Sequence, residues 1–205
     1  MILSLSIFSI FYYNLNKIFK KFQEDKIASN STALFHASTT VIICYYSLYL
    51  NVDSSFIFIN SSGYLLYDTY YIFKTGQFDI LRIMYIYHHI VVFSYIILPY
   101  DLHFWREIMF IAELSNIPNY LVYYSLKNDK KQGIKRSCLT NILLKLQLFV
   151  YFILRIFFLG YYGVQELYND KVEYVKFPIY MVSILYLFGV IWFLAMLKQN
   201  IKIFK

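Results

Sequence analysis

Charged side chains are scarce in this sequence. Lys, Arg, Asp and Glu make up 15% of its 205 residues, whereas soluble domains carry about 25%. This low charge content excludes a disordered chain and a charged coiled coil. The chain has only two cysteines, three prolines and six glycines, which excludes a disulfide scaffold and a collagen-like repeat. It is rich instead in aromatic residues, with 23 Tyr and 20 Phe.

Stretches with few or no charges recur along the whole chain. Most approach the ~20 residues that an α-helix needs to cross ~30 Å of hydrocarbon. A chain this short has too little interior to bury so many apolar runs in a soluble core. The pattern predicts an all-α, polytopic membrane protein with spans at residues 1–16, 31–50, 54–73, 83–99, 104–126, 138–162 and 177–197. The first span is short, but it lacks the basic start and the cleavage site of a signal peptide.

Basic residues are concentrated in alternate loops between these spans. Fourteen follow the first, third, fifth or seventh predicted span, whereas the other loops hold only Arg106, Lys171 and Lys176. By the positive-inside rule, the N-terminus is predicted to be luminal and the C-terminus cytosolic. This bias, which also favours contact with anionic lipid headgroups, accounts for the net charge of +7. We expect no nucleic-acid partner, because the chain carries no motif for one.

Ionisable side chains recur within the predicted spans. Each costs roughly 2.5 to 3.5 kcal/mol near the bilayer centre, so such residues mark candidate functional sites. They are His36, Asp68, His88, His89, Glu113 with its neighbour Asn116, and Lys145 and Arg155 in the same span. Counting ~1.5 Å per residue from the cytosolic ends predicts a depth of about 20 Å for Glu113 and about 8 to 10 Å for His36, Asp68 and both histidines of the pair.

The histidine pair suggests acid–base chemistry. Adjacent helical residues differ by 100° around the axis, so one of His88 and His89 can face a cavity while the other bonds a neighbouring helix. Imidazole can remove a proton from an amine or hydroxyl, or carry an acyl group, and a carboxylate such as Asp68 can orient it. The alternatives are hydrogen bonds between helices without chemistry and a proton pathway. No metal ligand is assigned, because no two histidines are three or four residues apart.

The order and spacing of several residues resemble the TLC-domain family, which includes the ceramide synthases and small proteins of lipid homeostasis. The resemblance covers about residues 27 to 200 and is closest to the small stand-alone members. It rests on Asn30, Ser31, Thr32, His36, Ala37, Gly63, Tyr64, Asp68, His88, His89, Glu113, Ser115, Pro118, Asn119 and Arg155. It implies a six-helix transmembrane ring around a lipid-sized tunnel open to the cytosol. Residues 1–26 then form a short N-terminal transmembrane segment with a basic loop, and residues 27–205 form the TLC domain.

The resemblance also implies roles for these residues. In ceramide synthases a double histidine and acidic residues transfer an acyl group from acyl-CoA to the amine of a sphingoid base. By resemblance, the catalytic residues are His88, His89, Asp68 and Glu113. The remaining candidates, which would bind substrate, are His36, Asn116, Tyr64 and Arg155.

The chain departs from the synthase pattern at three points. Val92 stands where the synthases carry Thr, Asn116 stands near their second Asp, and their long acidic segment is missing. The sequence therefore predicts a membrane protein of the endoplasmic reticulum that binds a long-chain lipid, with acyl-CoA as co-substrate and no resident cofactor. Lys74, Arg82 and the loop at residues 127–136 would hold the CoA phosphates. The alternative is a non-enzymatic regulator of membrane lipid composition, or a protein that binds a lipid or a partner.

Overall fold

The computed structural model describes residues 2–50, 52–76, 80–97, 104–168 and 176–201. These residues form helices and no strand, which confirms the all-α prediction for the described part of the chain. The elements are α1 Ile2–Lys20, α2 Asp25–Leu50, α3 Ser55–Thr75, α4 Ile80–Ile97, α5 Trp105–Lys131, α6 Cys138–Tyr151, the π-helix η1 Phe152–Phe158, α7 Leu159–Tyr168 and α8 Lys176–Ile201. Because α6, η1 and α7 follow one another without a break, they form one continuous rod.

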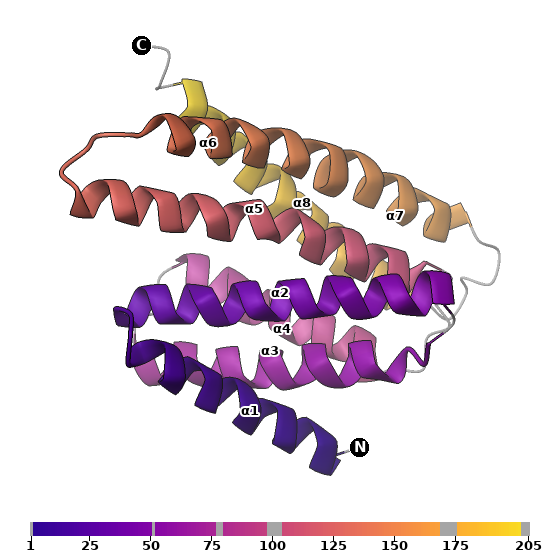
Figure 1. The fold of residues 1–205 in the computed structure, drawn as a ribbon. Helices are drawn as coiled ribbons and strands as arrows, with labels where there is room; N and C mark the ends of the chain where they lie inside the picture. Colours follow the sequence, from indigo (N-terminus) through magenta and orange to yellow (C-terminus); the bar gives the residue numbers. More distant parts are fainter. Residues whose placement is uncertain (1, 51, 77–79, 98–103, 169–175, 202–205) are drawn as a thin grey trace.

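The helices lie side by side in an elongated bundle (Figure 1). Helix α2 packs against α3, α3 against α4, α4 against α8, α8 against α6, α6 against α5, and α5 against α2. This series of contacts closes on itself, so the helices surround an interior. Helix α1 packs outside the series, against α2 and α3.

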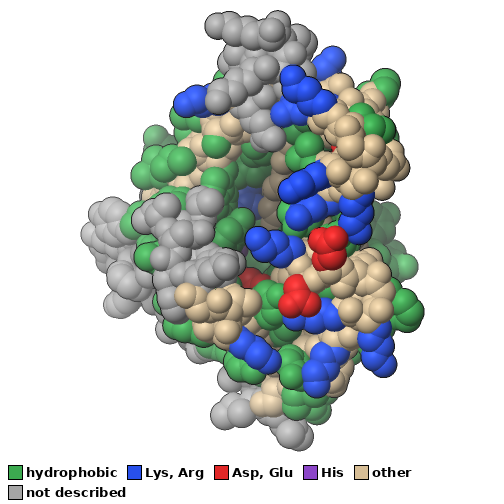
Figure 2. All heavy atoms as spheres, turned by 90° about the vertical axis from the view of Figure 1, so that its left-hand side faces the viewer, with side chains coloured by type: hydrophobic (Ala, Val, Ile, Leu, Met, Phe, Trp, Pro, Cys, Tyr) green, Lys and Arg blue, Asp and Glu red, His purple; other side chains and the backbone are tan. Residues whose placement is uncertain are grey.

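Basic side chains gather at one end of the bundle. The connections α1–α2 and α5–α6 and the last turn of α8 lie toward the left of Figure 1, and Figure 2 views this end directly, with Lys and Arg side chains gathered along one side of a hollow. Helices that end there carry basic residues in their last turns, namely Lys17, Lys20, Lys74, Lys130, Lys131 and Lys198. Basic residues that the sequence places in or beside alternate loops therefore lie at one end of the bundle.

Among the residues that the structure describes, two helices are long and apolar enough to cross a membrane. They are Asp25–Leu50 and the continuous rod Cys138–Gln165, while Ile83–Phe93 and Ser183–Lys198 are shorter apolar segments. Polar residues such as Asn60, Ser61 and Ser62 lower the hydropathy of α3, but these side chains are buried within the bundle. Length and composition alone thus support two of the predicted spans.

Helix α1 is joined to α3 by close packing and hydrogen bonds. Tyr12 is fully buried in a cluster with Tyr64 and Tyr67, and its hydroxyl donates to the Asn60 side-chain oxygen. The two helices approach most closely where Phe8 faces Gly63. A Cβ at position 63 would overlap the Cβ of Phe8 and lie 3.1 Å from its carbonyl carbon.

We expect Gly63→Ala to displace α1 and to lower the free energy of unfolding by about 1 to 3 kcal/mol, because the added methyl group overpacks this contact. Thermal unfolding in detergent measures the effect. Gly163→Ala is the matched control, since a Cβ there meets no atom within 4 Å. Equal melting temperatures for the two variants would contradict the packing argument.

The connection between α5 and α6 is held by Asp129. This carboxylate is 2% exposed and accepts hydrogen bonds from the Ser137 backbone N–H at 2.8 Å and the Thr140 hydroxyl at 2.6 Å. These hydrogen bonds lower the pKa of Asp129 below its ordinary value of 3.8. Ser137 in turn caps α6, because its hydroxyl accepts from the backbone N–H of Thr140.

The stabilisation from Asp129 should depend on pH. A carboxylate whose pKa is lowered by folding contributes fully above its unfolded pKa, and the contribution is lost as the pH falls through the lower folded value. We therefore expect Asp129→Asn to lower the melting temperature at pH 7 and to have a much smaller effect near pH 3. Ser137→Ala should cost about 1 kcal/mol at both pH values, since the cap does not titrate. Parallel pH dependences for the two variants would refute this assignment.

Candidate functional site

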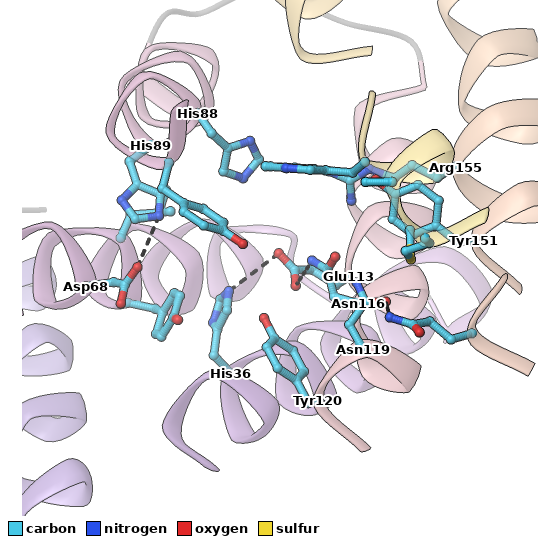
Figure 3. A pocket seen from close by; sticks show the side chains of 17 residues that line it. His36, Asp68, His88, His89, Glu113, Asn116, Asn119, Tyr120, Tyr151 and Arg155 are labelled. Carbon is cyan, nitrogen blue, oxygen red and sulfur yellow. Dashed lines mark hydrogen bonds and ion pairs between the residues drawn. The ribbon is translucent and has the colours of Figure 1, made fainter. Parts of the chain in front are cut away.

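The bundle encloses a cavity of about 350 Å³. Figure 3 shows its walls, which come from helices on both sides of the interior. The lining residues are His36, Tyr64, Leu65, Asp68, Tyr85, His88, His89, Glu113, Asn116, Asn119, Tyr120, Gln147, Tyr151, Arg155, Trp192, Ala195 and Met196. All eight candidate residues named from the sequence are among them. The structure thus brings together side chains from five separate elements of the chain.

A second cavity, of about 650 Å³, lies between this inner cavity and the basic end of the bundle. We call it the vestibule. It shares the walls Tyr64, Asp68, Tyr85 and Tyr120 with the inner cavity. Its outer part is lined by Asp25, Lys26, Ser29, Asn30 and Thr75, near the start of α2 and the end of α3. Four side chains therefore separate the inner cavity from a route to the basic end.

His89 is the histidine of the pair that binds a neighbouring helix. Its Nε2 lies 3.3 Å from a carboxylate oxygen of Asp68, and its Nδ1 lies 2.9 Å from the Thr69 hydroxyl. Both partners belong to α3. With both ring nitrogens engaged, His89 is held in one orientation, and it is 6% exposed.

His88 points into the inner cavity, toward Arg155 (Figure 3). Its ring centroid lies 5.9 Å from that of His89, with the planes tilted by 55°. Among the described residues, no side chain hydrogen-bonds to His88. One histidine of the pair therefore bonds a neighbouring helix and the other faces the cavity, as predicted. The one that faces the cavity is His88.

His36 and Glu113 form a second pair across the cavity. The His36 Nε2 lies 3.6 Å from the Glu113 carboxylate. On the other side of the ring, Nδ1 lies 3.4 Å from the hydroxyls of Tyr12 and Thr40. Tyr64 stacks on the imidazole with ring centroids 4.0 Å apart and planes 6° apart, so the ring is fixed on three sides.

This pair corrects the depth inferred from the sequence. Counting residues places Glu113 about 12 Å deeper than His36, whereas their side chains are in contact. The count is wrong because it takes the ends of the two apolar runs, Ser31 and Leu126, as one common level. Asn30 donates a hydrogen bond to the carbonyl of Tyr120, so the start of the first run lies level with Tyr120, six residues before the end of the other run.

Arg155 projects inward from the π-helix η1 and is 6% exposed. Its Nη1 donates to the Ala112 carbonyl at 3.0 Å and lies 3.4 Å from the Ser115 hydroxyl. Its Nε and the Tyr151 hydroxyl are buried without a hydrogen-bond partner. Because both residues line the inner cavity, these two donors remain available to a ligand.

Polar amides complete the same wall. Asn116 lies 3.4 Å from the Glu113 carboxylate as a hydrogen-bond donor, and Gln147 donates to Asn119 at 2.9 Å. Gln147, Tyr151 and Arg155 are spaced by four residues in the sequence, which would place them on one face of an α-helix. The turn from Phe152 to Phe158 is instead a π-helix, yet all three side chains reach the cavity.

Three aromatic walls are absent from the sequence-based candidates. Tyr85 lies three and four residues before the histidine pair, and Tyr120 lies four residues after Asn116, so helical spacing alone could have identified them. Trp192 comes from α8 and has no such signal. Tyr12, which supports His36 from α1, was missed for the same reason.

Comparisons with protein-family models, with curated proteins and with solved structures found no match. Within the described residues, no group of three or more His, Cys, Asp or Glu is arranged to hold a metal ion. The cavity walls carry imidazole, carboxylate, phenol and guanidinium groups. These groups can move protons and stabilise a developing negative charge.

Proposed function

We propose that this protein is a TLC-type polytopic membrane protein of the endoplasmic reticulum that binds a long-chain lipid in the inner cavity and transfers an acyl group from acyl-CoA to an amino lipid. One observation carries the proposal, namely the convergence of all eight sequence-derived candidates on a single cavity. A volume of this order suits a small-molecule site. In this proposal the six-helix series spans the bilayer with the N-terminus luminal and the C-terminus cytosolic.

The distribution of apolar side chains supports a membrane location. Large apolar residues cover the outward faces of the rod α6–η1–α7, as with Phe149 at 65% exposure. The same holds for Leu139, Ile142, Leu146, Phe152, Phe157 and Phe158. Polar groups such as Gln147 and Arg155 are buried on the inward face of the same rod. Lys145 of the same rod is exposed, but otherwise the rod from Leu139 to Phe158 has polar residues inside and apolar residues outside, which is the arrangement expected of a bundle surrounded by lipid.

The vestibule supports entry of acyl-CoA from the basic end. Lys26 lines the vestibule, and the Lys127 ammonium lies 5.7 Å from the ring centroid of Tyr123, another vestibule wall. Ammonium groups form charge-assisted hydrogen bonds with phosphates, so these two residues are suited to hold CoA. Lys74 lies over rings of α1 and α3 instead, and the side chain of Arg82 lies outside the described residues.

The proposed reaction begins when His88 accepts a proton from the amine of the amino lipid. The nitrogen attacks the thioester carbonyl carbon, a C–N bond forms, the C–S bond breaks, and the CoA thiolate leaves and takes up a proton. The unpartnered donors of Arg155 and Tyr151 are suited to stabilise the oxyanion of the tetrahedral intermediate. Asp68 holds His89 beside this centre.

The test uses purified protein with labelled acyl-CoA and a panel of amino lipids. The intact protein should form N-acyl product, and Leu65→Trp should lower its formation by about 100-fold by obstructing the cavity. Leu66→Trp is the matched control, because Leu66 is 41% exposed whereas Leu65 is 6% exposed and lines the cavity. Retained lipid without product would favour a non-enzymatic lipid-binding protein. Equal losses of product in both variants would show that the reaction does not take place in the inner cavity.

A further inference from the structure

A groove of about 260 Å³ lies on the outer side of the contact between α1 and α3. It is lined by Ser9, Ile10, Tyr13, Tyr67 and Tyr70. None of these residues lines the inner cavity or the vestibule. Ile10 and Tyr70 are each more than half exposed, so the groove is open to the surroundings of the bundle. We call it the outer groove.

Two lysines stand at one end of the outer groove. The Lys17 ammonium lies 4.5 Å from the ring centroid of Tyr13. The Lys74 ammonium lies 5.9 Å from the same centroid and 5.8 Å from that of Tyr70. Both lysines are in the last turns of their helices, which run in the same direction (Figure 1). The two positive charges therefore share the basic end of the bundle.

These two charges are not neutralised within the described part of the chain. Lys20 pairs with Asp25 and Lys131 pairs with Glu24, but no described carboxylate forms an ion pair with Lys17 or Lys74. Two like charges beside one ring repel each other unless an anion lies between them. The site is thus complementary to a negatively charged group.

The outer groove extends from these charges toward the middle of the bundle. Ser9 precedes Lys17 by eight residues, which corresponds to ~12 Å along the helix. The walls over this distance are mostly aromatic and aliphatic. A ligand that fits both parts has an anionic head and an apolar chain.

We propose that the outer groove binds an anionic phospholipid of the surrounding bilayer. Its phosphate lies between Lys17 and Lys74, and one acyl chain lies along Tyr13, Tyr67 and Ile10. A zwitterionic phosphatidylcholine offers the same phosphate, but its quaternary ammonium adds a third positive charge beside the two lysines. The inference rests on the membrane location in the proposed function and is independent of the acyl-transfer chemistry.

The test is native mass spectrometry of the full chain released from nanodiscs of equimolar phosphatidylglycerol and phosphatidylcholine. The intact protein should retain phosphatidylglycerol preferentially, and K17Q/K74Q should lower that preference by roughly 25-fold, since each of the two basic residues contributes about fivefold near a membrane surface. K130Q/K135Q is the matched control, because it removes the same charge from the same end of the bundle. Equal losses in the two double variants would overturn the site.

A second variant tests the outer groove without changing its charge. Ser9→Trp should obstruct the groove and also lower retention of phosphatidylglycerol, and unchanged retention would overturn the proposal even if K17Q/K74Q failed to fold. Equal retention of both phospholipids by the intact protein would do the same. The acyl-transfer assay separates the two proposals. Retention of phosphatidylglycerol by a protein that forms no product would refute acyl transfer and leave this site intact.

Discussion

Replacement of His88 by alanine is expected to lower the rate of acyl transfer by about 10²- to 10⁴-fold, the contribution typical of a positioned general base. The expectation follows from the orientation of His88, whose imidazole faces the inner cavity and hydrogen-bonds to no described side chain (Figure 3). Single-turnover measurements with labelled acyl-CoA report the loss. Lipid retention should be unchanged, because His88 holds no other helix in place.

His89→Ala provides the comparison. This variant should also lose activity, but it leaves Asp68 without its imidazole partner at 3.3 Å and should therefore unfold at a lower temperature. Asp68→Asn should lower activity less than His88→Ala does, because the amide can still hold the ring in place. A His88→Ala protein that retains more than half of the activity would exclude His88 as the base.

Loss of Glu113 is expected to have the largest effect on stability. Glu113→Leu should lower the free energy of unfolding by about 3 kcal/mol, because it removes the partner of a buried imidazole held by three other helices. His36 is 2% exposed, so its imidazole has little contact with solvent in the intact protein. Thermal unfolding of the purified protein, with lipid composition held fixed, measures the difference.

A double-mutant cycle shows whether the pair itself is responsible. His36→Phe should keep the stacking on Tyr64. Combining it with Glu113→Leu should recover part of the lost stability, because the double variant leaves neither polar group of the pair buried without its partner. Additive losses in the double variant would show that His36 and Glu113 are not coupled.

Much of the helical organisation could be predicted from the sequence, because helix length, hydropathy and loop charge are local properties. The runs around Thr40 and Phe149 predict apolar helices, and the structure has them. The candidates His36, Asp68, His88 and Glu113 could also be identified locally, since an ionisable group in an apolar run is unusual wherever it points. Their convergence on one cavity follows from the order of helix contacts.

The pairing within the site could not be predicted in the same way. Which carboxylate contacts which histidine depends on how far each helix extends beyond its apolar run, as the contact between His36 and Glu113 illustrates. The π-helical turn at Arg155 has no signal in the spacing of polar residues. Tyr12 belongs to a segment outside the domain predicted at residues 27–205, yet its hydroxyl lies 3.4 Å from the Nδ1 of His36.

The contacts of α1 determine when this helix can dock during synthesis of the chain. Tyr12 and Asn16 are buried polar residues of the first helix, and their partners Asn60 and Thr32 are synthesised later. At about 5 to 20 residues per second, the ribosome needs several seconds to advance from Tyr12 to Asn60. The Thr32 partner of Asn16 is made before that interval ends, whereas the phenol of Tyr12 lacks its Asn60 acceptor throughout it. Final docking of the first helix therefore waits for the third helix to leave the ribosome.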